Sequence, residues 1–164
     1  MSKQALLVID MQVGVCCGDE VLYQLDELIA GINKRIHHFR KNDAPIIFVQ
    51  HEDEELVAGE PAWELLPELL ARPDDFYIRK THPNAFYQTE LQNLLDSLQI
   101  DELEICGAQT EYCVDSTVKF AHGLGYRLYM KPGFSSTITN IQMDAQTTIT
   151  FYEAIWNNRF LQFI

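Results

Sequence analysis

The fold of this chain is decided by the stretch Leu103–Cys113, whose sequence is LEICGAQTEYC. Its apolar start is typical of a buried strand, and the turn that follows leads into the first turn of a helix. Cys113 is therefore expected at a helix N-terminus, where unpaired N–H groups and the positive end of the helix dipole lower the pKa of a thiol. A cysteine in that environment is a candidate nucleophile.

On both sides of this stretch, short apolar runs alternate with longer amphipathic segments. The run Ala5–Asp10 is almost continuously apolar, which is typical of a strand that is buried on both faces. Such runs predict five strands and a short sixth, at Ala5–Asp10, Pro45–Val49, Phe76–Arg79, Leu103–Cys106, Tyr126–Met130 and Phe160–Ile164. Apolar residues spaced by three and four predict helices at Glu20–Lys41, Trp63–Leu70, Tyr87–Leu98, Val114–Leu124 and Asn140–Asn158.

Strands that alternate with helices predict an α/β fold with three α/β/α layers. The expected sheet is doubly wound, mostly parallel and five- to six-stranded, and it belongs to a single domain over residues 1–164. In such folds, ligands bind beyond the carboxyl ends of the strands, near the point where the strand order reverses. Polar side chains stand at these ends in four strands, in chain order Asp10, Gln50 with His51, Lys80, and Cys113. We expect these side chains to gather at one edge of the sheet.

The composition is that of a soluble globular protein, with 164 residues of which 47% are hydrophobic and 22% charged. The formal net charge of −12 argues against nucleic acid or an anionic membrane as a partner, because both require basic patches. The four cysteines do not have the spacing of a disulfide framework. The first residues lead into a strand without the pattern of a signal peptide, and no apolar run approaches the ~20 residues of a membrane span. We therefore expect a cytoplasmic protein.

Three of the strand-end residues together have the chemistry of a hydrolytic site. A hydrolytic cysteine needs a base for its proton, a cation or dipole that holds the thiolate, and donors for the oxyanion. Asp10, Lys80 and Cys113 are of the right types. Each also has an ordinary structural interpretation, as a capping carboxylate, a solvated lysine or a buried cysteine. Their joint occurrence at matching strand ends favours a catalytic site.

Four segments, in this order along the chain, resemble a known family. They are Leu6–Gln12, Lys80 with the following Ala85–Leu91, Gly107–Val114, and Gly123–Tyr126. In these segments the chain resembles the isochorismatase-like cysteine hydrolases, a group that includes nicotinamidases, N-carbamoyl amidohydrolases and ureidoacrylate hydrolases. The resemblance covers nearly the whole chain.

The resemblance implies a role for each residue of the site. Cys113 would attack an amide-type carbon, Asp10 would take the thiol proton and later deliver it to the leaving nitrogen, and Lys80 would stabilise the pair. The family also has a cis peptide bond in the nucleophile turn, which maps onto Ala108–Gln109. There it would aim the N–H groups of Gln109 and Cys113 at one point, as an oxyanion hole. Isochorismatases proper cleave a vinyl ether without a cysteine nucleophile, so Cys113 argues against that branch.

The resemblance weakens at the metal site that nicotinamidases carry, an Asp-x-His pair after the second strand. Here that region, Gln50–Glu55, reads QHEDEE, and no second histidine follows before His82. His51 with the neighbouring acids is a candidate for a divalent cation, and a solvated acidic loop is the alternative that we favour. We predict no required metal and no cofactor. The partners that we expect are a small-molecule substrate and further copies of this chain, because the resemblance implies a homo-oligomer, either a dimer or a tetramer.

The lining of the substrate pocket is less well defined by the sequence. Gln12 is a candidate polar contact or a turn residue. Trp63, Phe86 and Tyr112 are candidate pocket walls, and each is equally compatible with the core or a subunit interface.

Three functions compete at this point. The leading hypothesis is a hydrolase of a small amide or a related C–N bond that acts through a covalent thioester on Cys113. The second is a catalytically silent binding or scaffold protein of the same fold. The third is a redox sensor in which Cys113 pairs with Cys16 or Cys17. The sequence does not name the substrate.

Overall fold

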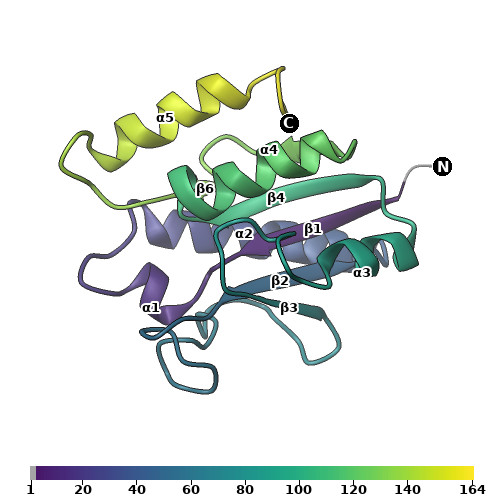
Figure 1. Cartoon of the computed structure of the whole chain (residues 1–164), viewed down its shortest axis with the longest axis horizontal. Coiled ribbons are helices and arrows are strands. Elements are labelled where there is room, and N and C mark those ends of the chain that lie inside the picture. Colours follow the sequence, from purple (N-terminus) through teal and green to yellow (C-terminus); the bar gives the residue numbers. More distant parts are fainter. Residues whose placement is uncertain (1–2) are drawn as a thin grey trace.

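The core of the protein is a parallel sheet with the strand order β3-β2-β1-β4-β5-β7 (Figure 1). The structure is a computed structural model that describes residues 3–164. A seventh strand, β6, pairs with the end of β4. The strands are β1 (Gln4–Ile9), β2 (Ile46–His51), β3 (Phe76–Lys80), β4 (Glu102–Ala108), β5 (Arg127–Met130), β6 (Ser135–Ser136) and β7 (Gln162–Phe163). The chain builds the sheet outward from β1 in one direction and then from β4 in the other. This doubly wound order confirms the predicted α/β fold.

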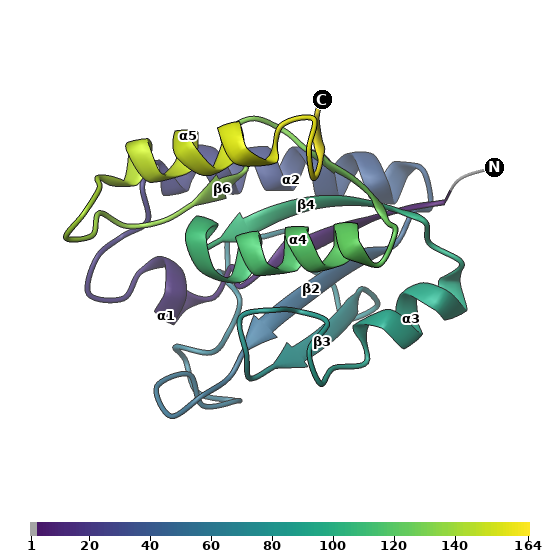
Figure 2. The same cartoon turned by 45° about the horizontal axis from the view of Figure 1, so that its top comes forward.

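Helices cover both faces of the sheet, as Figure 2 shows. They are α1 (Val13–Cys16), α2 (Leu25–Lys41), α3 (Leu91–Leu98), the π-helical turn η1 (Thr110–Val114), α4 (Asp115–Gly123) and α5 (Ala145–Trp156). The apolar side of α2 packs on one face, while α3 and α4 pack on the other together with Trp156 of α5. None of the helices in the described part of the chain is both long enough and apolar enough to cross a membrane.

The central strand β1 is buried on both faces, as its continuous apolar run predicts. Leu6 and Val8 belong to the core under α2, whereas Leu7 and Ile9 belong to the core under α3 and α4. All four side chains are completely buried. This placement fixes the end of β1, and therefore the start of the loop that follows it, in the middle of the molecule.

The segment Trp63–Leu70, predicted as a helix, forms turns instead. Its backbone groups bond to the segment after β1, and within the segment the Leu69 N–H donates to the Leu66 carbonyl at 3.1 Å. The Val13 N–H donates to the Glu64 carbonyl at 2.9 Å, and the Leu66 N–H donates to the Met11 carbonyl at 3.0 Å. The apolar spacing in this segment therefore reflects packing of Leu66 and Leu69 in the core under α2, not a helical repeat.

Two short elements differ from the sequence-based expectation by their presence, and the helices α2, α3, α4 and α5 are all shorter than predicted. α1 is a single turn and β6 has two residues, so neither is long enough to show a periodicity. α2 begins at Leu25 because Gln24 adopts a left-handed backbone conformation, with φ 49°. α5 covers Ala145–Trp156, with the Asp144 side chain accepting a hydrogen bond from the Thr147 N–H at its start.

A close approach of two central strands positions the turn after β4. The sheet register pairs Gly107 with Ile9. Gly107 has φ +127°, and a Cβ atom built on it would overlap the backbone of Ile9. Only glycine fits this position without displacement of β1, so the turn that follows β4 lies directly beside the end of β1.

Candidate active site

Four side chains from four different segments meet at the carboxyl edge of the sheet. Asp10 directly follows β1, His51 ends β2, Lys80 ends β3, and Cys113 lies in η1 after β4. The register of the sheet pairs His51 with Lys80. The Asp10 N–H donates to the carbonyl of Val49 in β2 at 2.9 Å. The structure thus brings the three predicted residues together and adds His51 to them.

Lys80 lies at the centre of this cluster. Its side chain is completely buried. Its Nζ atom is 2.8 Å from Asp10 Oδ2, 3.0 Å from His51 Nδ1 and 3.2 Å from Cys113 Sγ. An ammonium group has three N–H donors and no acceptor. The three neighbours therefore use its whole hydrogen-bonding capacity, which makes burial of the charge tolerable.

Asp10 is placed to accept a proton. The residue is 2% exposed, and burial raises the pKa of its carboxyl, although the Lys80 ammonium acts in the opposite direction. Oδ1 is buried and has no hydrogen-bond partner among residues 3–164. A carboxylate oxygen of Asp10 lies within 4.8 Å of Cys113 Sγ. A buried carboxylate with one oxygen that lacks a donor, close to a thiol, is a suitable acceptor for the thiol proton.

The pKa of the Cys113 thiol contradicts a sequence-based prediction. The sequence predicts that the helix start lowers this pKa, and the structure raises it. Burial, followed by the neighbouring Asp10 carboxylate, raises the pKa of Cys113 to about 12, although Lys80 lowers it. The expectation is wrong because loss of hydration penalises the thiolate more than the short turn η1 stabilises it. Cys113 therefore rests as a thiol, and a neighbouring base would have to accept its proton before the sulfur could act as a nucleophile.

The cluster also contains the donor atoms of a metal site. Ligand atoms of Asp10, His51 and Cys113 all lie within 4.8 Å of one another. Lys80 Nζ, however, lies 2.8 to 3.2 Å from each of these residues. An ammonium group thus takes the position in which a metal ion would contact all three. We expect dialysis against a chelator to leave the function of this site unchanged.

The turn before Cys113 is anchored to β6. The peptide bond Ala108–Gln109 is cis, at the position that the family resemblance implies. The hydroxyl groups of Thr110 and Ser135 share a hydrogen bond of 2.9 Å. The Gln109 N–H has no acceptor within the described residues, so it is free to donate to a ligand.

Comparison with known protein families matches residues 4–140 to the isochorismatase domain. The chain belongs to the isochorismatase family. A solved isochorismatase family protein is 48% identical, with a TM-score of 0.96 over 98% of this chain and 97% of that chain. Streptothricin hydrolase from Streptomyces noursei is 28% identical over 150 residues, which are 82% of this chain and 60% of that protein. The chain therefore spans less than two thirds of that relative.

The same fold occurs in N-carbamoylsarcosine amidase from Thermoplasma acidophilum. That structure has a TM-score of 0.82 and 20% sequence identity, over 98% of this chain and 95% of that chain. At this identity the likeness concerns the fold alone.

In this isochorismatase family member, the predicted pocket residue Gln12 bonds to backbone groups. Its Nε2 donates to the carbonyls of His51 and Trp63, at 2.9 Å in each case, and its Oε1 accepts from the His51 N–H at 2.8 Å. Gln12 therefore ties the end of β2 to the loop that contains Trp63. The ring of Trp63 lies 5.6 Å from the guanidinium carbon of Arg79.

The other two predicted pocket residues lie elsewhere. Phe86 is 7% exposed and packs in the core, with ring centroids 5.7 Å from Phe120 and 5.9 Å from Tyr126. Tyr112 is 56% exposed on the surface. Neither residue lines the cleft that reaches Gln109, and none of the four cluster residues lines it either.

That cleft has a volume of about 450 Å³. Its wall includes Gln109 of the nucleophile turn and Asp53, whose Oδ2 lies 3.2 Å from His51 Nε2. The charged residues that line it are all acidic, namely Asp19, Glu20, Asp53 and Glu55. The cleft therefore gives a small molecule a negatively charged approach to the turn.

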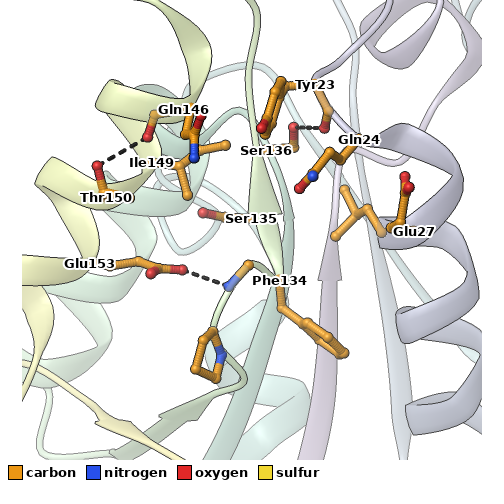
Figure 3. Close-up of a pocket in the computed structure, with 13 residues that line it drawn as sticks. Tyr23, Gln24, Glu27, Phe134, Ser135, Ser136, Gln146, Ile149, Thr150 and Glu153 are labelled. Carbon is orange, nitrogen blue, oxygen red and sulfur yellow. Dashed lines mark hydrogen bonds between the residues drawn. The ribbon is translucent and has the colours of Figure 1, made fainter.

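A second cavity, of about 320 Å³, lies between α2, α5 and β6 (Figure 3). On its α5 side, the Glu153 carboxylate accepts a hydrogen bond of 2.6 Å from the Gly133 N–H. None of the four cluster residues lines this cavity. Its link to the site is Ser135, which lines the cavity and bonds to Thr110 in η1.

Proposed function

We propose that this isochorismatase-family hydrolase cleaves a C–N bond of a small amide, carbamoyl or ureido compound through a covalent thioester on Cys113. The observation that carries the proposal is the position of the Lys80 ammonium, which donates to both the Asp10 carboxylate and the Cys113 sulfur in a buried site. This arrangement places a base, a nucleophile and a stabilising cation within reach of one another.

The first half of the reaction forms the thioester. Asp10 Oδ1 accepts the thiol proton as Cys113 Sγ attacks the carbonyl carbon, and an S–C bond forms while the carbonyl oxygen becomes an oxyanion. The raised pKa of Asp10 suits it to hold this proton. When the tetrahedral intermediate collapses, the C–N bond breaks and Asp10 returns the proton to the departing nitrogen. Ammonia or an amine leaves.

The second half of the reaction consumes water. A water molecule attacks the thioester carbon and gives a proton to Asp10, and the S–C bond then breaks. The acid product leaves, and Asp10 returns the proton to the Cys113 sulfur. Lys80 keeps its ammonium charge throughout, so it stabilises whichever of the two neighbours is negative at each step.

Backbone N–H groups of the nucleophile turn are the proposed donors to the oxyanion. Gln109 lines the cleft, and its N–H lacks an acceptor within residues 3–164. Together with the Cys113 N–H it would form the oxyanion hole that the family resemblance implies. The streptothricin hydrolase relative and the amidase of the same fold are compatible with this class of reaction.

The experiment is a screen for ammonia or amine release over small amides, carbamoyl compounds and ureido compounds. We expect at least one compound to be hydrolysed and the rate to fall by about 10³-fold or more in Cys113→Ala. Cys17→Ala is the matched control, because Cys17 is an exposed cysteine outside the cluster. Hydrolysis at the native rate by Cys113→Ala would rule the proposal out. A folded protein that hydrolyses nothing in the screen would favour the binding or scaffold function.

We also propose that the active form is a homo-oligomer in the cytoplasm. Large side chains that lie exposed on the surface support this assembly, among them Tyr112 at 56%, Tyr87 at 47% and Phe120 at 44% exposure. Light scattering on the purified protein is the test, and a monomer at assay concentration would contradict the proposal.

A further inference from the structure

The third hydrogen bond of Lys80 is not used by the proposed chemistry. Two of its donors reach Asp10 and Cys113, and the third reaches His51 Nδ1 at 3.0 Å. Lysine ammonium can only donate, so Nδ1 of His51 accepts this bond and carries no proton. His51 therefore acts on Lys80 as a neutral imidazole.

The other ring nitrogen lies beside the carboxylate of Asp53. Because Nδ1 accepts, the ring proton of neutral His51 lies on Nε2, which is 3.2 Å from Asp53 Oδ2. The second oxygen of Asp53 accepts the N–H groups of Glu55 at 2.9 Å and Leu56 at 2.8 Å. These backbone bonds keep Asp53 ionised, and they lower the pKa of its carboxyl. A carboxylate held in this way selects the tautomer that Lys80 needs.

The backbone of His51 is held as firmly as its side chain. Gln12 accepts from the His51 N–H at 2.8 Å and donates to its carbonyl at 2.9 Å. In the sheet, His51 lies directly opposite Lys80, and the Glu52 N–H donates to the Lys80 carbonyl at 2.8 Å. The imidazole is therefore a fixed acceptor and not a mobile surface group.

We propose that His51 is a positioning residue for Lys80: held in one tautomer by Asp53, it accepts the third hydrogen bond of the ammonium and so directs the other two at Asp10 and Cys113. The inference rests on the proposed hydrolysis for its catalytic consequence, but the geometry of Lys80 can be tested without a substrate. A Lys80 that lacked this acceptor would be free to rotate or to bind water, and its bond to the Cys113 sulfur would weaken.

Protonation of His51 would remove the acceptor that Nδ1 offers to the Lys80 ammonium. The charged groups that face the ring are Lys80 from β3, Asp10 after β1 and Asp53 in the loop after β2. Burial and then the Lys80 charge lower the pKa of His51, although both carboxylates act in the opposite direction. The neutral, accepting form thus persists at neutral pH. In acid the ring gains a proton on Nδ1, becomes a donor and repels the ammonium.

Two substitutions distinguish a requirement for a hydrogen-bond acceptor at this position from a requirement for the imidazole ring. His51→Asn places a carbonyl oxygen near the position of Nδ1 and does not titrate, whereas His51→Leu fills the space without an acceptor. His82→Leu is the matched control, because His82 is an exposed histidine two residues after Lys80. Thermal unfolding of each variant shows whether it is folded.

The first measurement is the alkylation rate of Cys113 by iodoacetamide at a pH of about 8, read from the peptide that contains Cys113. We expect the rate to fall about tenfold or more in His51→Leu, and to stay within about threefold of native in His51→Asn and His82→Leu. This readout needs no substrate, so it tests the positioning role even if the screen for hydrolysis fails. A folded His51→Leu that is alkylated at the native rate would overturn the proposal.

The second measurement is the pH dependence of kcat/KM on a hydrolysed compound. In acid, the native protein should lose activity with two protonations, of Asp10 and of His51. The His51→Asn variant should lose activity with one protonation, because only Asp10 still titrates. The proposal would be overturned if kcat/KM fell equally steeply with decreasing pH in the native protein and in His51→Asn. A histidine with only a structural role would leave this steepness unchanged.

Discussion

At the scale of single residues, the site consists of one buried cation and the three groups that accept its hydrogen bonds. Lys80 is completely buried, and each of its three neighbours lies at hydrogen-bond distance. The Asp10 carboxylate balances its charge, and the neutral thiol and imidazole complete its shell. This arrangement lets a proton move between Cys113 and Asp10 while the total charge of the cluster stays constant, which avoids the cost of creating a new buried charge.

Replacement of Lys80 by Met should remove the cation and keep the volume. We expect kcat/KM to fall by about 100-fold or more, because the thiolate and the oxyanion both lose their counter-charge. Lys80→Arg should not restore activity, since a planar guanidinium cannot present three N–H groups from one compact centre. The measurement is steady-state hydrolysis with both variants. Native activity in Lys80→Met would show that the ammonium takes no part.

The alkaline side of the pH profile reports how the thiol is activated. The pKa of Cys113 is raised to about 12, so the fraction of thiolate formed by exchange with solvent grows tenfold per pH unit up to that value. If Asp10 accepts the proton within the cluster, the rate does not depend on this fraction. We therefore expect kcat/KM to be flat between about pH 8 and 10. A tenfold rise per pH unit over that range would contradict transfer to Asp10.

At the scale of elements, three strand ends and the turn after β4 carry the site, and most of this arrangement follows from the sequence. The apolar runs predict β1 to β5 and the short β7, and the rule for parallel sheets places Asp10, Lys80 and Cys113 at one edge. The role of His51 could not be predicted, because it depends on the register between β2 and β3 and on the direction of one ring. The signal available was that His51 and Lys80 both end neighbouring strands.

The errors at this scale also have physical reasons. The segment Trp63–Leu70 has helical spacing, yet its backbone bonds to residues that precede it by about fifty positions, and such non-local pairing leaves no local pattern. The sequence predicts a lowered pKa for Cys113 because it shows the start of a helix, whereas it does not show the degree of burial. Burial proves to be the larger effect.

The contact between β1 and β4 gives a prediction about stability. In Gly107→Ala, the added Cβ would overlap the Ile9 backbone at a residue with φ +127°. We expect the free energy of unfolding to fall by about 2–4 kcal/mol. Gly123→Ala is the control, because nothing lies within 4 Å of a Cβ at Gly123. Urea unfolding compares the two variants, and equal stability would contradict the close approach.

At the scale of the whole molecule, the negative charge of the chain acts on a charged substrate before it reaches the site. The chain carries a net charge of −12, and the charged residues that line the cleft beside the turn are all acidic. A negative potential focused in a cleft attracts cations and repels anions before any contact forms. The same potential explains why nucleic acid is not expected as a partner.

Among substrates that differ only in charge, this potential should favour a cationic one. We expect kcat/KM for an amide with a distant ammonium group to exceed that of its carboxylate counterpart by about tenfold at low salt. The ratio should approach one as salt is added, because screening removes long-range attraction. It should also fall in a variant that carries Asp19→Asn and Glu55→Gln. A ratio that does not change with salt would contradict this account of substrate selection.

The central claim is that Cys113 carries the acyl group of the substrate, and the most direct measurement is mass spectrometry of the protein quenched with acid during turnover. The account predicts an intact mass increased by that of the acyl group, with the addition located by fragmentation on the peptide that contains Cys113. It also predicts no such addition in Cys113→Ala. Turnover without any adduct on Cys113, together with hydrolysis at the native rate by Cys113→Ala, would contradict the account.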